Sequence, residues 1–185
     1  MRNTKRLVLA GLCVALGVIL PIAFHAIPNG GRIFSPMHIP VLLAGLLTGP
    51  LYGLLVGFVT PLLSATLTGM PPLAILPGMT VELAIFGLVS GLFIRYFPIR
   101  GYVPAIYISL VSAMLLGRVG AGVVNALIFQ LGTYSMEIWI TSYFVTSFPG
   151  ILVHLIAVPH VCFALKQMGV IASPREAALQ LEYLK

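Results

Sequence analysis

Long apolar runs separated by short polar or Gly/Pro-containing breaks recur along the whole chain. From them we predict helices over residues 7–24, 37–48, 51–68, 75–97, 102–131 and 147–167. A helix needs about 20 apolar residues to cross a bilayer. The run at 37–48 is shorter than that, so we expect it to be tilted or sunk in a bundle. The pattern predicts an all-α integral membrane protein, a compact bundle of six transmembrane helices.

The breaks between the runs carry turn and helix-start residues. Gly49-Pro50 marks a tight turn after the second run. Ser147, with Pro149 two residues later, is a helix-start signal for the sixth run. The polar tail at 169–185 is expected to lie outside the membrane. We therefore predict a single transmembrane domain over residues 1–185, which ends in a short cytoplasmic tail at 169–185.

The composition supports a membrane protein. Hydrophobic residues make up 59% of the chain and charged residues 8%, whereas soluble proteins carry about 25% charged residues. The mean hydropathy is +1.09. The net charge of +6 is spread over the helix ends rather than gathered in a patch, so it indicates topology and not nucleic-acid binding.

The positive charges predict the orientation of the bundle. With six spans and both termini in the cytoplasm, eight of the ten Lys and Arg residues fall inside, and Arg32 falls outside. Positive residues concentrate on the cytoplasmic side of membrane proteins. The inside set is Arg2, Lys5, Arg6, Arg95, Arg100, Lys166, Arg175 and Lys185.

One cation lies within an apolar run. Arg118 and Asn125 are seven residues apart, almost two helical turns, so they share one helix face. Counting about 1.5 Å per residue, Glu82 and His154 each lie roughly 10 Å below the outer boundary. Arg118 lies about 24 Å up a core about 30 Å thick, which is nearly the same level. Charge at this depth normally faces a partner or a cavity.

Further polar residues lie above this layer. Asn125, Gln130 and His38 are predicted nearer the outer surface, and the inner half of the bundle has few polar groups. A channel needs polar groups along its whole length. This distribution predicts a blind pocket open to the outside, with Trp139 and Tyr143 as a lid.

Structural explanations remain open for each of these residues. Arg118 and Glu82 can form a buried ion pair that joins two helices. His154 can be a core hydrogen-bonding residue, and Asn125 can link two helices. The aromatic residues Trp139 and Tyr143 also suit an interfacial belt.

Catalytic motifs are missing from the sequence. It contains no Walker A motif, no His-Glu-x-x-His, no Gly-x-Ser-x-Gly and no Asp. We predict no catalytic residues, no metal site and no cofactor, and the chain is expected to bind rather than to catalyse.

Three segments in this order carry a family resemblance. They are LVLAGLCVAL at 7–16 after a basic start, MHIPVLLAGLLTGP at 37–50, and PGIL at 149–152 with Pro159 and a basic end. With the size and six spans, the sequence resembles the substrate-binding S components of energy-coupling factor (ECF) vitamin transporters. The resemblance covers nearly the whole chain.

The resemblance implies a function and partners. It implies high-affinity binding of a small water-soluble vitamin or precursor from outside the cell, with the loops at 25–35 and 132–146 covering the ligand. It implies a location in the plasma membrane, and as partners a transmembrane coupling subunit and the two ATPase subunits that drive it. Small residues of the first helix, here Gly11 and Ala15, would contact the coupling subunit.

The predicted site combines both lines of reasoning. Arg118 would hold an acceptor on the ligand, Glu82 would hold Arg118 or a ligand hydroxyl, and Asn125 and Gln130 would add hydrogen bonds. An anion such as pantothenate or niacin fits a lone Arg, and a neutral ligand fits equally if Glu82 neutralises it. The alternative functions are a stand-alone secondary transporter and a non-catalytic membrane assembly protein.

Overall fold

The computed structural model describes residues 3–24, 27–97 and 101–169, and the tail predicted at 169–185 lies outside them except for Gly169. Within these residues, six helical segments are long and apolar enough to cross a membrane. This confirms the predicted all-α membrane fold. The segments contain α1 (Asn3–Phe24), α2 (Gly30–Phe34) with α3 (His38–Thr48), α4 (Pro50–Thr68), α5 (Leu76–Tyr96), α6 (Tyr102–Val124) and α8 (Phe148–Gln167).

The region between α6 and α8 is more ordered than the sequence suggests. We expected one helix over 102–131 and an irregular segment over 132–146. Instead α6 passes into a π-helical turn, η1 (Asn125–Phe129), and α7 (Met136–Ile140) passes into a second, η2 (Thr141–Thr146). Gly132, at a φ of 78°, lies in the turn that reverses the chain between them. Wider i→i+5 turns of this kind are frequent at functional sites.

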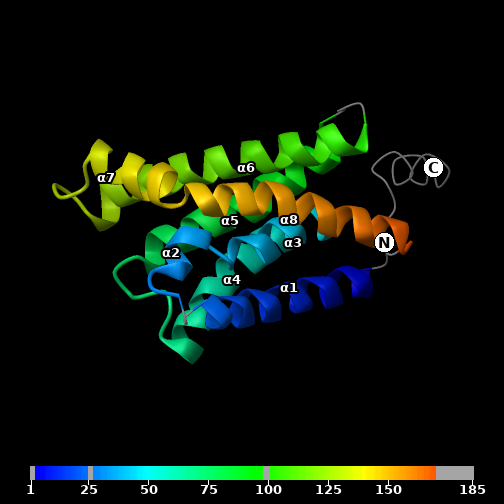
Figure 1. Ribbon diagram of the computed structural model, residues 1–185, viewed down its shortest axis with the longest axis horizontal. Coiled ribbons are helices and arrows are strands. Elements are labelled where there is room, and N and C mark those ends of the chain that lie inside the picture. Colours follow the sequence, from blue (N-terminus) through cyan, green and yellow to red (C-terminus); the bar gives the residue numbers. More distant parts are fainter. Residues whose placement is uncertain (1–2, 25–26, 98–100, 170–185) are drawn as a thin grey trace.

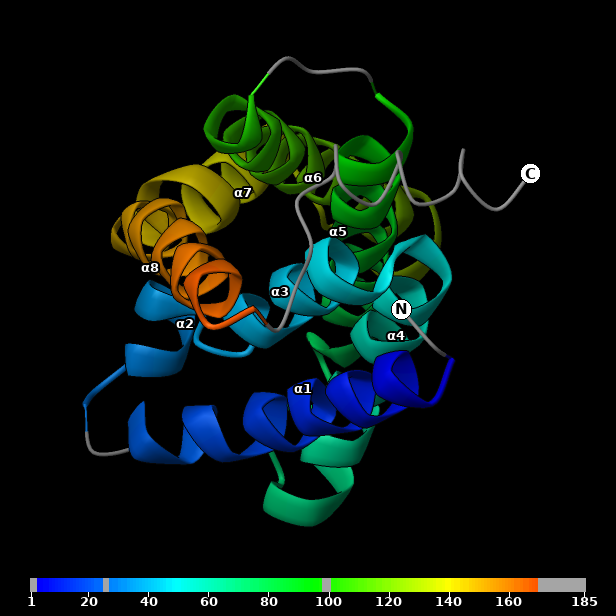
Figure 2. The same ribbon diagram turned by 90° about the vertical axis from the view of Figure 1, so that its right-hand side faces the viewer.

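Two helices form the centre of the bundle. In the apolar stretch that spans the membrane, 56% of the residues are buried in the α2–α3 segment and in α5, against 28% in α1 and α8. Figure 2 shows α3 in the middle of the bundle and α5 between α4 and α6, with α1 and α6 on opposite sides. The short α3 is thus sunk in the bundle, as expected from its length.

Glycines set the distance between α4 and α5. A Cβ atom at Gly53 would meet the backbone of Gly87, and one at Gly87 would meet the backbone of Gly53. Gly57 lies in the same way against the backbone of Leu83, and Gly91 against that of Pro50. Small residues allow the backbones of membrane helices to approach closely. This contact fixes the half of α5 nearer Tyr96 against α4.

The two ends of the bundle differ. The beginning of α1 and the end of α8 lie at one end, and α2 and α7 lie at the other (Figure 1). Lys5 and Lys166 lie at the first end, and Arg32 in α2 lies at the second. We continue to expect the first end to face the cytoplasm, by the bias in positive charge.

Candidate substrate-binding site

A cavity of about 670 Å³ opens at the end of the bundle that carries α2 and α7. Its wall is built from the end of α1, α2, the start of α3, the 70–79 segment, α5, α6 and the 130–147 segment. Six residues of the predicted site line it, namely Glu82, Arg118, Asn125, Gln130, His38 and Tyr143.

Charged side chains form the floor of the cavity. Glu82 on α5 is 5% exposed and Arg118 on α6 is 3% exposed. Arg118 Nε lies 3.6 Å from Glu82 Oε1, and His38 Nε2 lies 3.7 Å from Glu82 Oε2. Both separations exceed ordinary hydrogen-bond lengths. Arg118 Nε and His38 Nδ1 are buried without a hydrogen-bond partner among the described residues.

His154 packs against His38 on the side away from the cavity. Its ring stacks on that of His38, with the centroids 5.5 Å apart, and it is 0% exposed. His154 Nε2 lies 3.1 Å from the carbonyl oxygen of Ser35, at the end of α2. The structure thus brings His154 to the predicted layer, but places it against His38 rather than in the cavity wall.

The amide of Asn125 and two tyrosine hydroxyls lie beyond this charged floor. Asn125 Nδ2 donates to Tyr143 Oη at 3.3 Å, which ties η1 to η2. Burial, followed by the charge of Glu82, raises the pKa of the Tyr143 phenol, so Tyr143 is neutral at physiological pH. The hydroxyl of Tyr134 lines the cavity and is buried without a hydrogen-bond partner among the described residues.

Trp139, predicted as part of a lid over the pocket, does not line the cavity. Its Nε1–H donates to the backbone carbonyl of Arg118 at 3.0 Å, and its indole occupies the space left by Gly122. The ring also packs edge-on against Phe144, whose face lies 5.4 Å from the Arg118 guanidinium carbon. Trp139 therefore fastens α7 to α6 outside the cavity wall.

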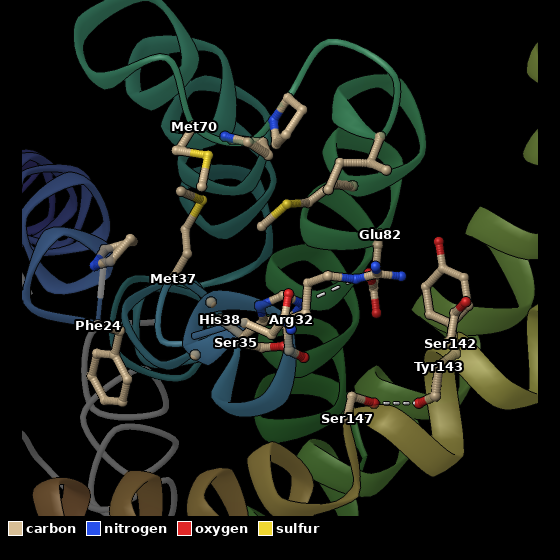
Figure 3. Close-up of a pocket in the computed structure, with 18 of the residues that line it drawn as sticks. Phe24, Arg32, Ser35, Met37, His38, Met70, Glu82, Ser142, Tyr143 and Ser147 are labelled. Carbon is tan, nitrogen blue, oxygen red and sulfur yellow. Dashed lines mark hydrogen bonds and ion pairs between the residues drawn. The ribbon is translucent and has the colours of Figure 1, made fainter. Parts of the chain in front are cut away.

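The opposite wall was not predicted from the sequence. It is apolar and includes Phe24, Met37 and Met70. Figure 3 shows Phe24, Met37 and Met70 across the cavity from Glu82 and Tyr143. Met79 was missed as well, although its position three residues before Glu82 on the same helix face indicates that it lines the cavity beside Glu82.

The two small residues of the first helix lie apart from the cavity. Gly11 and Ala15 are both exposed on α1, and a Cβ atom at Gly11 would meet nothing within 4 Å. Large apolar side chains surround them on this face: Leu7, Val8, Leu12, Leu16 and Ile19. The face is flat at Gly11 and unoccupied by the described residues.

Comparison with known proteins identifies the family. The family model described as "ECF transporter, substrate-specific component" matches residues 5–172, which confirms the resemblance drawn from the three sequence segments. No curated protein and no solved structure matches the chain. The family consists of membrane-embedded, substrate-binding subunits of ECF transporters, which bind a small molecule and work with an ECF module. The chain belongs to the family of ECF transporter substrate-specific components.

Proposed function

We propose that this protein captures a water-soluble vitamin or vitamin precursor with high affinity at the outer face of the plasma membrane and passes it to the ECF module. The observation that carries the proposal is the pair Arg118 and Glu82, buried in the bundle yet lining a cavity. The residues that line the cavity include those of α2, at the end of the bundle opposite the beginning of α1 and the end of α8 (Figure 1).

The pair has hydrogen-bonding capacity to spare. A buried donor without a partner costs about 1–3 kcal/mol, and more when it is charged. Arg118 Nε has no partner among the described residues, and its contact with Glu82 is 3.6 Å long. A purely structural ion pair would be expected to close this gap. A ligand between or beside the two groups would satisfy both.

The remaining residues receive roles from their positions. Arg118, Glu82, His38, Asn125 and Gln130 line the cavity and would contact the ligand. Tyr143 also lines it and would contact the ligand from the side of η2. Trp139 and His154 would position Arg118 and His38, to which they are joined.

The exposed face of α1 would dock the transmembrane coupling subunit, which two ATPase subunits drive. Gly11 and Ala15 leave a flat strip between large apolar side chains, and flat strips allow helices to approach closely. A partner helix would cover the apolar side chains that surround it.

The binding site is tested by identifying what the protein retains. The full chain is purified in lipid nanodiscs and denatured, and the released small molecules are identified by mass spectrometry. The retained compound is then titrated calorimetrically into ligand-free protein. We expect Arg118→Ala and Glu82→Ala each to weaken binding at least about 100-fold, about 2.7 kcal/mol.

His160→Phe serves as the matched control. His160 is exposed on α8 and its Nδ1 contacts only its own helix, at the carbonyl of Ile156, among the described residues. The affinity of His160→Phe for the retained compound should equal that of the unsubstituted protein. Undiminished affinity in folded Arg118→Ala and Glu82→Ala proteins would rule out the site.

Transport is tested in vesicles with and without the ECF module. Uptake of the retained compound should require the coupling subunit, both ATPase subunits and ATP. Uptake by the chain alone would instead support a stand-alone secondary transporter. Retention of no small molecule would favour an assembly protein.

Docking is tested by adding bulk to α1. Gly11→Trp should abolish co-purification with the coupling subunit while ligand binding persists. Leu115→Trp is the control, since Leu115 is 50% exposed on α6, on the opposite side of the bundle. Equal effects of the two substitutions would exclude α1 as the docking face.

A further inference from the structure

The two walls of the cavity differ in chemistry. Phe24, Met37 and Met70 lie on one side, whereas Glu82 and Tyr143 lie on the other (Figure 3). Methionine side chains are flexible and polarisable, and they pack well against flat aromatic and irregular apolar groups. A molecule that fills this cavity must therefore present an apolar body to one wall and a polar head to the other.

The charges at the polar wall cancel. Glu82 and Arg118 carry opposite charges 3.6 Å apart. His38 Nε2 lies 3.7 Å from the other carboxylate oxygen of Glu82, and His38 Nδ1 has no hydrogen-bond partner among the described residues. The floor thus offers both donors and acceptors without a net charge.

This arrangement discriminates against charged heads. Charge interactions strengthen in a low-dielectric setting, so a carboxylate on Arg118 would be repelled by Glu82 beside it. An ammonium on Glu82 would be repelled by Arg118 in the same way. An amide, lactam or ureide edge carries a donor and an acceptor together, so it pairs with Glu82 and Arg118 at once without repulsion.

Arg32 does not change this balance. It lines the mouth of the cavity from α2, and it is exposed. Exposed charges are screened by water and salt. Arg32 can attract anions toward the mouth, but the head that reaches the floor meets the cancelled pair.

We infer that the ligand of this cavity is an amphipathic molecule with an uncharged amide-like head, which pairs with Arg118 and Glu82, and an apolar body, which lies against Phe24, Met37 and Met70. This inference rests on the proposed function, because it takes the cavity as the substrate site. It names the chemical class that the site selects.

Three probes with one skeleton test the class. Indole-3-acetamide, indole-3-acetate and tryptamine share an apolar ring and carry an uncharged, an anionic and a cationic head. Each is titrated calorimetrically at pH 7 into the ligand-free full chain in phosphatidylcholine nanodiscs, with empty nanodiscs as the blank. We expect the amide to bind at least about tenfold more tightly than either charged probe. Equal or tighter binding of a charged probe, or no binding by any of the three, overturns the inference.

Variants that unbalance the pair should switch the preference. Glu82→Gln leaves Arg118 uncompensated and should favour indole-3-acetate over the amide, whereas Arg118→Gln should favour tryptamine. His160→Phe should keep the ranking of the unsubstituted protein, because His160 is exposed on α8 and does not line the cavity. A ranking that none of the pair variants alters overturns the inference, and the unsubstituted ranking remains decisive if a variant fails to fold.

The outcomes separate this inference from the proposed function. A preference for the carboxylate, together with ATP-dependent uptake of a retained compound, overturns the uncharged head and leaves the proposed function in place. A preference for the amide without uptake in the presence of the ECF module supports the class of ligand and overturns the transport role.

Discussion

The two halves of α5 differ in how closely they pack against their surroundings. In the half nearer Tyr96, Gly87 and Gly91 bring the backbone against α4, and a Cβ atom at either would collide with it. In the half nearer Leu76, Met79 and Glu82 line a cavity of about 670 Å³. One half removes all space between helices and the other preserves it.

The difference separates stability from recognition along a single helix. The close-packed half contributes van der Waals contact, which drives helix association in lipid. The open half carries buried charge, which is costly in a membrane and is retained where it functions. Rigid packing in one half holds Glu82 in position in the other.

The largest expected effect comes from forcing a side chain into the close contact between α4 and α5. Gly87→Leu should destabilise the protein by more than about 3 kcal/mol or prevent folding, because the side chain has only the Gly53 backbone to displace. Gly11→Leu is the matched control, since its Cβ meets nothing. The free energies of unfolding are measured by denaturant titration in detergent. Similar losses for both substitutions would contradict the role of the glycine contact.

The next effect comes from breaking the charge pair. Arg118→Met should lower the free energy of unfolding by about 3 kcal/mol, because it leaves Glu82 buried without its counter-charge. The double variant Arg118→Met/Glu82→Leu should regain part of this loss while ligand binding stays abolished. Additive losses in the double variant would show that the two groups are not coupled.

A smaller effect is expected at the fastening between α7 and α6. Trp139→Phe removes the hydrogen bond to the Arg118 carbonyl, a loss of about 1 kcal/mol. If this fastening holds the cavity wall, the retained ligand should dissociate about fivefold faster, measured by rapid dilution. Ile140→Val, at a residue 45% exposed, should leave the dissociation rate unchanged.

The smallest effect is expected at the tyrosine hydroxyl. Tyr143→Phe should weaken affinity for the retained compound about threefold, because Asn125 loses its acceptor. Burial raises the pKa of Tyr143 above the ordinary tyrosine value of about 10, so the phenol stays protonated throughout the physiological pH range. The ratio of affinities between Tyr143→Phe and the unsubstituted protein should therefore stay constant from about pH 6 to 9. A ratio that changes over this range would show that Tyr143 titrates there.

Much of the bundle follows from the sequence because hydropathy and helical rise are regular. The apolar runs predicted six membrane-spanning segments, and the short run at 37–48 predicted a sunken α3. Depth counting from the helix ends placed Glu82 and Arg118 at one level, and the structure brings them within 3.6 Å. These arguments need only a constant rise per residue.

The irregular part could not be predicted in the same way. The cavity wall between Asn125 and Ser147 depends on two π-helical turns, and a helical period gives no warning of them. Trp139 therefore faces the α6 backbone rather than the cavity. The pattern of apolar positions also did not separate Met37 and Met79, which line the cavity, from ordinary core residues.

The π-helical turns make the site adjustable by changes in chain length. Each accommodates about one residue more than an α-helical turn, so deleting one residue from η1 would restore α-helical register. Every side chain beyond it would then rotate by about 100°, carrying Gln130 and Tyr134 away from the cavity. Insertions and deletions in 125–129, rather than substitutions at the charged floor, thus offer a route by which related chains can acquire different ligands on the same bundle.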